Sequence, residues 1–333
     1  IQRLTINALN TLNKLIMKAV NDQLERATSI LTDACDEHEP VHIYVGYSGG
    51  DDSLVTTHLT MQWAKHIDLP ASVLHVNTGI GIPQTRTHVR ETCDEMGWAL
   101  DEYHAKEDCG QDYEQLVMEY GFPGPGHHRK MYNRLKERCI RLAVKEKKTA
   151  WKDRVLLATG IRAEESQRRA GYDRVMQRNG ATVWVNPIYS WTGQHCHDYI
   201  STHDLPRNPV SEKLGMSGEC LCGAFAHKGE KEMIRLVSPE TADRIERLEE
   251  RVWAAGHKWR WEEKPTKALR MEREGQRALF ERPFCNGCGK REVQPSKQVQ
   301  ELMSKPLINE LPLQILPSFA EEIGLEKAGI MEQ

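Results

Sequence analysis

The stretch Tyr47-Ser48-Gly49-Gly50-Asp51-Asp52-Ser53 lies between an apolar run at residues 41–45 and a helical pattern at residues 54–59. This order predicts a strand, a glycine-rich turn and the first turn of a helix. A helix N-terminus that follows such a turn presents unpaired backbone N–H groups and a partial positive charge. The stretch therefore predicts a pocket for phosphate.

The side chains of this loop suit an anion. Gly49 and Gly50 carry no Cβ atom, so the backbone can approach a ligand closely. Ser48 and Ser53 add hydroxyl donors, and Asp52 either caps the helix or holds Mg²⁺. The pattern is not the Walker-type loop, which places a lysine directly after its second glycine. The alternative interpretation is a tight turn without a ligand.

The bulk composition fits a folded protein. The chain has 333 residues, of which 39% are hydrophobic, so it can bury a core. It lacks a run of about 18 apolar residues, and no basic segment followed by an apolar one opens the sequence, which begins at Ile1. We therefore expect a cytoplasmic protein without a membrane span or a secretory signal. The net charge of −3 by itself excludes no class of partner.

The order of strands and helices predicts an α/β fold. Strand-like runs and helical patterns alternate, which gives a mostly parallel sheet with right-handed crossovers and flanking helices. We expect an N-terminal helical segment at 1–38, a nucleotide-binding domain at 39–238, and a charged helical, cysteine-bearing region at 239–333. Strands are predicted at 41–47, 71–76, 98–103, 154–159 and 182–185, and helices at 5–35, 53–66, 84–96, 129–148, 191–203 and 318–328.

A second loop, Gly160-Ile161-Arg162, follows the strand predicted at 154–159. Ligands of an open parallel sheet lie beyond the carboxyl ends of its strands, so this loop is expected beside the first. A guanidinium can bind phosphate through two parallel hydrogen bonds, which makes Arg162 a candidate for neutralising phosphate charge. The alternative is that Arg162 pairs with Glu165 at the surface.

The first loop resembles the PP-loop of the ATP pyrophosphatase superfamily, and further segments resemble the phosphoadenosine-phosphosulfate reductase family in the broad sense. The resemblance covers roughly residues 40–225 and implies a nucleotide cleft. The matching segments are Ser48–Ser53, Val76–Gly79, Gly160–Ser166, Asn186–Trp191 and His203–Pro209.

The resemblance also implies roles for particular residues. The first loop, Ser48 to Ser53, would hold ATP phosphates together with Mg²⁺. The turn Asn77-Thr78-Gly79 would lie near the adenosine. Gly160 would border the phosphates, and Asp52 and Arg162 would take part in catalysis. The domain at 39–238 would then be an ATP pyrophosphatase domain.

One difference separates the chain from the sulfonucleotide reductases of this family, which carry a nucleophilic cysteine near the C-terminus. No cysteine follows Cys288. The chain is more similar to the ATP pyrophosphatases of DNA phosphorothioation, DndC and SspD. That resemblance implies that ATP adenylates a backbone oxygen of DNA, which sulfur replaces, with a cysteine desulfurase and other modification-complex proteins as partners. The alternatives are a sulfonucleotide reductase, a PP-loop tRNA thiolase and a nucleotide-binding module without catalysis.

Nine cysteines are present, and four of them form two close pairs, Cys220 with Cys222 and Cys285 with Cys288. Clustered cysteines in a protein of this class indicate metal rather than disulfides. Four thiolates suit either tetrahedral Zn²⁺ or a [4Fe–4S] cluster. Because members of the resembled family bear clusters, we expect iron–sulfur, with Zn²⁺ as the alternative.

Residues 129–154 contain eleven Lys and Arg against three Asp and Glu, which favours either a nucleic-acid partner or a solvated helix face. We expect this segment to face DNA. Cys139 lies within it, and positive neighbours lower a thiol pKa. Cys139 is therefore a candidate sulfur carrier or cluster ligand, or otherwise a buried helix residue. The preceding pair His127-His128 is a candidate for contacting phosphates.

Overall fold

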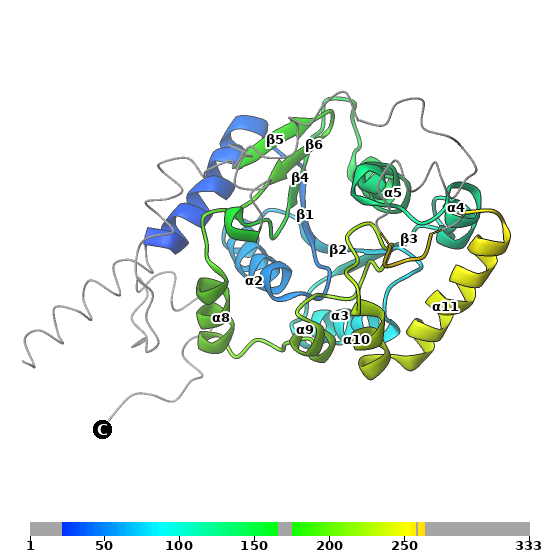
Figure 1. Ribbon diagram of the computed structural model, residues 1–333. Helices are drawn as coiled ribbons and strands as arrows, with labels where there is room; N and C mark the ends of the chain where they lie inside the picture. Colours follow the sequence, from blue (N-terminus) through cyan, green and yellow to red (C-terminus); the bar gives the residue numbers. More distant parts are fainter. Residues whose placement is uncertain (1–21, 166–174, 258, 264–333) are drawn as a thin grey trace, which may run out of the picture.

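The computed structural model describes residues 22–165, 175–257 and 259–263 (Figure 1). Its centre is a six-stranded sheet with the strand order β3-β2-β1-β4-β6-β5. The strands are β1 His42–Gly46, β2 Ala71–Asn77, β3 Leu100–His104, β4 Val155–Ala158, β5 Met176–Asn179 and β6 Thr182–Val185.

All neighbouring strands pair in parallel except β5 and β6, which form an antiparallel hairpin. The prediction of an α/β fold with a mostly parallel sheet is confirmed. β5 was not among the predicted strands, because its sequence Met-Gln-Arg-Asn is polar and three of its four residues are exposed at the sheet edge. A short edge strand of this kind lacks the apolar pattern by which strands are recognised.

Helices lie between the parallel strands β1 to β4, a turn joins β5 to β6, and the segment 22–38 is also helical. Predicted helix residues before 22, and the helix predicted at 318–328, lie outside the described residues. The basic helix predicted at 129–148 is observed as α5, a π-helical turn at Asn133–Glu137, and α6. The α-helices are α2 Asp51–His66, α3 Pro83–Glu95, α4 Tyr113–Tyr120, α5 His128–Tyr132, α6 Arg138–Lys147, α8 Gly193–Thr202, α9 Pro209–Leu214, α10 Glu230–Val237 and α11 Pro239–Ala254.

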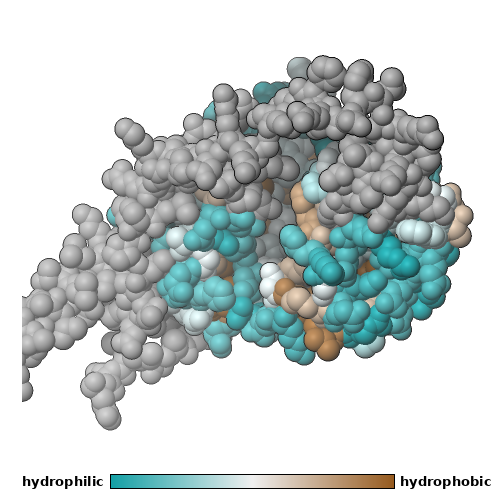
Figure 2. All heavy atoms as spheres, viewed as in Figure 1, coloured by the Kyte–Doolittle hydropathy of each residue, from teal (hydrophilic) through white to brown (hydrophobic). Residues whose placement is uncertain are grey.

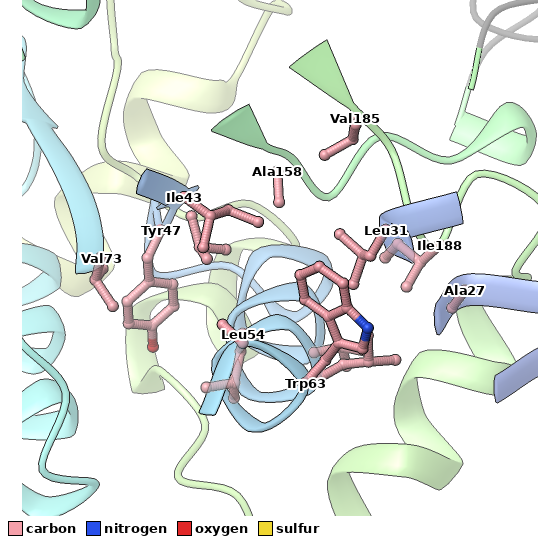
Figure 3. Close-up of a cluster of buried hydrophobic side chains, with 14 of the residues drawn as sticks. Ala27, Leu31, Ile43, Tyr47, Leu54, Trp63, Val73, Ala158, Val185 and Ile188 are labelled. Carbon is pink, nitrogen blue, oxygen red and sulfur yellow. The ribbon is translucent and has the colours of Figure 1, made fainter. Parts of the chain in front are cut away.

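Alternating side chains of β1 pack on opposite faces of the sheet, as strand geometry requires. Ile43 joins a cluster that includes Leu31 of the segment 22–38 and Trp63 of α2 (Figure 3). Tyr44 points the other way, into a cluster with Ile140 of α6. The sheet is therefore buried between two helical layers, and its strand ends are left to form a site.

A further apolar cluster lies beside the sheet and includes the described part of the charged C-terminal region. Ile245 and Leu248 of α11 pack there with Phe122 and Leu135. Two of the three tryptophans at 253–261 pack on the core. Trp259 and Trp261 are 6% and 1% exposed, whereas Trp253 is 40% exposed.

The described surface is mainly hydrophilic in the view of Figure 2, with hydrophobic residues gathered at its lower edge, where Figure 1 places α9 and α10. On α10, the side chains of Met233 and Leu236 are 46% and 86% exposed. Among the described residues, the helices are all too short or too polar to cross a bilayer.

Candidate nucleotide-binding site

Ser53 holds the first loop in shape. Its Oγ accepts hydrogen bonds from the N–H groups of Gly50, at 3.2 Å, and Ser48, at 3.3 Å, and donates to the Gly50 carbonyl at 2.7 Å. Gly49 has a φ of 80°, a left-handed conformation that glycine adopts without a steric penalty. The predicted strand, glycine turn and helix are all present, because β1 ends at Gly46 and α2 begins at Asp51.

The second loop packs directly on the first. A Cβ atom at Gly160 would lie 2.7 Å from the backbone carbonyl carbon of Asp52, so only glycine fits at this position. Arg162 Nε lies 2.8 Å from Asp52 Oδ1, and a terminal nitrogen of Arg162 lies 2.6 Å from Glu164 Oε2. The expected neighbourhood of the two loops is thus observed. Glu165 Oε2 accepts a hydrogen bond from the backbone N–H of Arg162 at 3.0 Å.

Arg207 and Asn208, for which the sequence motifs predict no role, also hold the first loop in place. Arg207 binds Asp51 with both a terminal nitrogen, at 2.6 Å, and Nε, at 3.3 Å. Asn208 is 2% exposed and donates from Nδ2 to the Gly49 carbonyl at 2.9 Å. Its Oδ1 accepts from Val210 N–H, so it also caps α9. The Asn-Pro pair at a helix start was the local signal for the cap, but nothing local indicated the contact with Gly49.

The two loops open onto a cavity of about 810 Å³ at the carboxyl ends of the parallel strands. This is the position in which open α/β sheets bind ligands. Its walls carry cations from three separate elements: Arg162 from the second loop, Arg207 before α9, and Lys136 from the π-helical turn. Ser48, Gly50, Asp51, Asp52, Ser53 and Gly160 also line it.

A buried His–Glu pair forms another part of the cavity wall. His75 Nε2 lies 3.2 Å from Glu219 Oε2, and the two side chains are 1% and 2% exposed. Burial acts to lower the pKa of His75, but the hydrogen bond and charge of Glu219 outweigh it, so the pKa is raised. His75 Nδ1 lies 2.8 Å from the Tyr47 carbonyl. His75 of β2 therefore contacts both the residue that follows β1 and Glu219, the residue that precedes Cys220.

The turn Asn77-Thr78-Gly79 directly follows Val76, which lines the cavity, but the turn itself does not line it, and its predicted place near the adenosine stays a prediction. Thr78 is fully buried, its N–H bonds Glu219 Oε1 at 3.2 Å, and its hydroxyl donates to the Glu219 carbonyl at 2.9 Å. Asn77 Oδ1 accepts from Gly79 N–H. The turn is occupied by contacts with Glu219, and it is Glu219 that reaches the cavity wall.

Cys139 differs from the expected reactive thiol. Its side chain is fully buried, and its Sγ donates to the Leu135 carbonyl at 3.8 Å. Burial raises the pKa of Cys139, and a hydrogen bond with Cys109 raises it further. The prediction that positive neighbours lower this pKa is therefore wrong. The thiol packs in the core with Met131 and Leu135, so burial rather than the charged neighbours sets its pKa.

Cys220 and Cys222 line a second cavity of about 320 Å³. A hydrogen bond from Cys222 lowers the pKa of Cys220 to about 6, so the pair shares its proton unequally. The other two predicted ligands, Cys285 and Cys288, lie outside the described residues. Within residues 22–165, 175–257 and 259–263, no three His, Cys, Asp or Glu side chains are arranged to hold a metal ion. Two thiols on one cavity wall are compatible with half of a four-cysteine site.

The basic segment presents one face to the cavities. Tyr132, Lys136 and Ile140 line the larger one, and His128 lines the smaller. His127 lines neither cavity. The predicted contact of the His127-His128 pair with phosphates stays a prediction, with only His128 at a cavity wall.

Comparison with known proteins places this site within a known family. The sequence profile of the phosphoadenosine phosphosulfate reductase domain matches residues 42–215. An uncharacterized protein of Methanocaldococcus jannaschii is 28% identical over 240 residues, which make up 67% of this chain and 46% of that protein. The adenosine 5'-phosphosulfate reductase of Salinibacter ruber is 29% identical over 144 residues, 43% of this chain and 53% of that enzyme. The chain thus spans about half the length of these two relatives.

Among solved structures, the U34-tRNA thiolase NcsA from Methanococcus maripaludis with its [4Fe-4S] cluster is 15% identical. The match covers 90% of this chain and 91% of that one, with a TM-score of 0.40.

Proposed function

The chain belongs to the phosphoadenosine phosphosulfate reductase domain family, and on that premise we propose that it is an ATP pyrophosphatase that activates the DNA backbone for sulfur insertion. The observation that carries the proposal is the contact between the two loops. Gly160 packs on the backbone of Asp52, and Arg162 bonds to its carboxylate. The first residues of α2 and a fixed guanidinium thereby line one cavity, which is the arrangement that suits the phosphates of ATP.

The proposed reaction has two displacements. An oxygen of the acceptor phosphate attacks the α-phosphorus of ATP, the bond to the bridging β-phosphate oxygen breaks, and pyrophosphate leaves. The outer sulfur of a persulfide then attacks the acceptor phosphorus, and AMP leaves with the original oxygen. After these two displacements at phosphorus, a second thiol of the sulfur donor attacks the inner sulfur of the S–S bond, which forms a disulfide and leaves one sulfur atom on the phosphorus. Arg162 and the loop N–H groups would bind the charge that develops on pyrophosphate.

Mg²⁺ is part of this proposal, and Asp52 at the cavity wall is the carboxylate that suits it. Mg²⁺ commonly binds through one or two carboxylates together with phosphate oxygens, and it neutralises phosphate charge when bound. Arg162 holds Asp52 in place at the beginning of α2. The chain's own contribution is therefore a carboxylate whose orientation is set before the nucleotide arrives.

DNA is the proposed acceptor because the basic segment 129–154 supplies Lys136 to the cavity wall and carries further cations outward. Arg138 and Lys145 of α6 are exposed. A polyanion attracted by these charges would be guided towards the ATP site. The sulfur donor in this proposal is a cysteine desulfurase, acting with other proteins of a modification complex.

Cys220 and Cys222, with Cys285 and Cys288, are the proposed ligands of a [4Fe–4S] cluster, with Zn²⁺ as the alternative. Support comes from the two thiols of the first pair, which share one cavity wall. A cluster or a zinc ion supplies a positively charged centre that holds thiolates deprotonated. Cys220 and Cys222 would hold the metal centre in the cavity that Lys136 also lines, next in sequence to Glu219.

A sulfonucleotide reductase is the second candidate. Sequence similarity favours it, because the relative from Salinibacter ruber is an adenosine 5'-phosphosulfate reductase. The same cavity would then hold the nucleotide of the sulfonucleotide, and a thiol would have to attack its sulfur.

One set of assays separates the two candidates. Protein purified without oxygen is incubated with ATP, with or without duplex DNA, and AMP and pyrophosphate are measured. Formation of both in equal amounts, stimulated by DNA, is the expected result. A parallel reaction supplies adenosine 5'-phosphosulfate and a dithiol reductant, and sulfite is measured. Sulfite formation without release of pyrophosphate from ATP would overturn the proposal in favour of the reductase.

A further inference from the structure

The two cavities adjoin, and three residues line both of them: Tyr132, Lys136 and Met216. The larger cavity carries the two phosphate loops, and the smaller one carries the cysteine pair. A group bound at the junction would therefore reach the ATP site on one side and the thiols on the other.

Lys136 stands at this junction on the π-helical turn Asn133–Glu137. Such turns occur often at functional sites. Two basic neighbours on the segment are paired, since Arg134 binds Gln111 and Arg141 binds Glu137. Lys136 is partly buried, and within the described part of the chain it has neither a hydrogen bond nor a carboxylate partner. A partly buried cation without a carboxylate is stabilised by an anion, and a phosphate is one that fits the site.

An aromatic pair marks the mouth of the smaller cavity. The rings of Phe225 and His128 lie 4.7 Å apart at an interplanar angle of 49°, and both residues line the cavity. Phe225 is 50% exposed, whereas Cys222 on the same wall is 8% exposed. An exposed aromatic face beside a cation is the arrangement that binds a single nucleic-acid strand, with a base stacked on the ring and the backbone on the cation.

We propose that the smaller cavity is the acceptor site, which takes one unstacked nucleotide unit of a nucleic acid. Lys136 binds its backbone phosphate at the junction, and Phe225 with His128 stacks on its base. This inference rests on the proposed function, because it names where the acceptor lies relative to ATP. It assigns stacking of the base to the aromatic pair and positioning of the phosphate to Lys136.

The test is the binding of a fluorescein-labelled DNA single strand of about 12 nucleotides, followed by anisotropy without ATP. Lys136→Met and Phe225→Ala are each expected to weaken binding by about tenfold or more, as loss of a phosphate contact or a stacked base does. Lys136→Arg is expected to restore most of the affinity, since it keeps the charge.

Two matched controls lie on the same basic segment but line neither cavity. Lys145→Met removes an exposed positive charge, and Trp151→Ala removes an aromatic ring that is 87% exposed. Each control is expected to change affinity by less than about twofold. Wild-type affinity in Lys136→Met and Phe225→Ala would overturn the acceptor site. Equal losses in the controls would also overturn it, in favour of general attraction to the basic segment.

The same strand made of RNA distinguishes the two nucleic acids. If the RNA strand binds more tightly than the DNA strand, and its binding depends on Lys136 and Phe225, the acceptor site is supported but DNA is overturned as the acceptor. Pyrophosphate release by the unaltered protein tests the proposed function separately. If ATP is not cleaved but strand binding still depends on Lys136 and Phe225, the proposed function fails and the site stands.

Discussion

Arg162 Nε lies 2.8 Å from Asp52 Oδ1, so the cation of the second loop forms an ion pair with a carboxylate in the first turn of α2. The Arg162 side chain is only 11% exposed, and burial of a charged pair is tolerated where the geometry satisfies it. The two sequence-distant loops therefore behave as one unit. A change in either residue is expected to act on both.

Arg162→Ala is expected to lower pyrophosphate release from ATP by at least about 100-fold, because it removes a fixed donor for the developing charge. Asp52→Asn is expected to reduce the rate as well. Since the residues act as one pair, the double variant should lose little more than the worse single variant. Steady-state release of pyrophosphate by all three proteins measures this.

A control for this experiment is Arg178→Ala, which removes an exposed arginine of β5 whose Nε bonds the Gly180 carbonyl. The Arg178→Ala variant should release pyrophosphate from ATP at the wild-type rate. If the losses of Arg162→Ala and Asp52→Asn simply multiply in the double variant, the two residues act independently and the coupling is refuted.

Gly160→Ala tests the contact between the loops without altering any charge. The new Cβ would lie 2.7 Å from the backbone of Asp52, so one loop must move. We expect a loss of about 1–3 kcal/mol in the free energy of unfolding, together with weaker ATP binding. Gly126→Ala is the matched control, because nothing lies within 4 Å of its Cβ position. Urea unfolding and ATP titration calorimetry measure the two effects, and unchanged ATP affinity would refute the steric argument.

Asn208→Asp separates the two roles of this side chain. An aspartate can still accept from Val210 N–H and cap α9, but it cannot donate to the Gly49 carbonyl. The Gly49 carbonyl would then lie beside a carboxylate. We expect this to lower the free energy of unfolding by about 1–3 kcal/mol and to weaken ATP binding. Asn208→Ala loses the cap as well and should be less stable still. Equal stabilities of Asn208→Asp and the wild type would show that the contact with Gly49 is unimportant.

The first loop could be predicted from the sequence because its signals are local. An apolar run, two glycines and a helical pattern follow one another directly at residues 41–59, and the structure has them in that order. The position of Gly160 also followed, since parallel strands end at one edge of the sheet.

The partners of the first loop could not be predicted in the same way. Arg207 lies 156 residues from Asp51, and Asn208 lies 159 residues from Gly49, so only the folded chain brings them together. The burial of Cys139 stayed one of two alternatives for a related reason. Composition showed its charged neighbours but not which side of the helix faces the core.

The proposed metal centre predicts a spectroscopic change. If the protein holds a [4Fe–4S] cluster, it should absorb at about 400 nm after purification without oxygen. If the metal is zinc, this absorption should be missing and zinc should be found by metal analysis. Cys220→Ser is expected to lower the metal content in either case. Cys35→Ser, a change in the helical segment 22–38, is the control and should keep it. Full metal content in Cys220→Ser would remove this cysteine from the ligand set.

A buried pair of histidines predicts how stability depends on pH. The rings of His58 and His203 lie 5.0 Å apart, and His58 Nδ1 lies 2.9 Å from the Tyr199 hydroxyl. Burial lowers the pKa of His58 to about 3, with a contribution from His203, and burial lowers that of His203 to about 4. In the unfolded chain both would titrate near about 6.5. The folded state therefore binds fewer protons, so stability present above about pH 6.5 is lost as the pH falls towards 4.

His203→Gln should flatten this loss, because glutamine keeps polar atoms but does not titrate. The decrease in the free energy of unfolding between about pH 7 and 4 is expected to shrink by up to about 3 kcal/mol relative to the wild type. Urea unfolding at a series of pH values measures the difference, and His66→Gln, at an exposed position, is the control. Parallel curves for His203→Gln and the wild type would contradict the lowered pKa of His203 in the folded state.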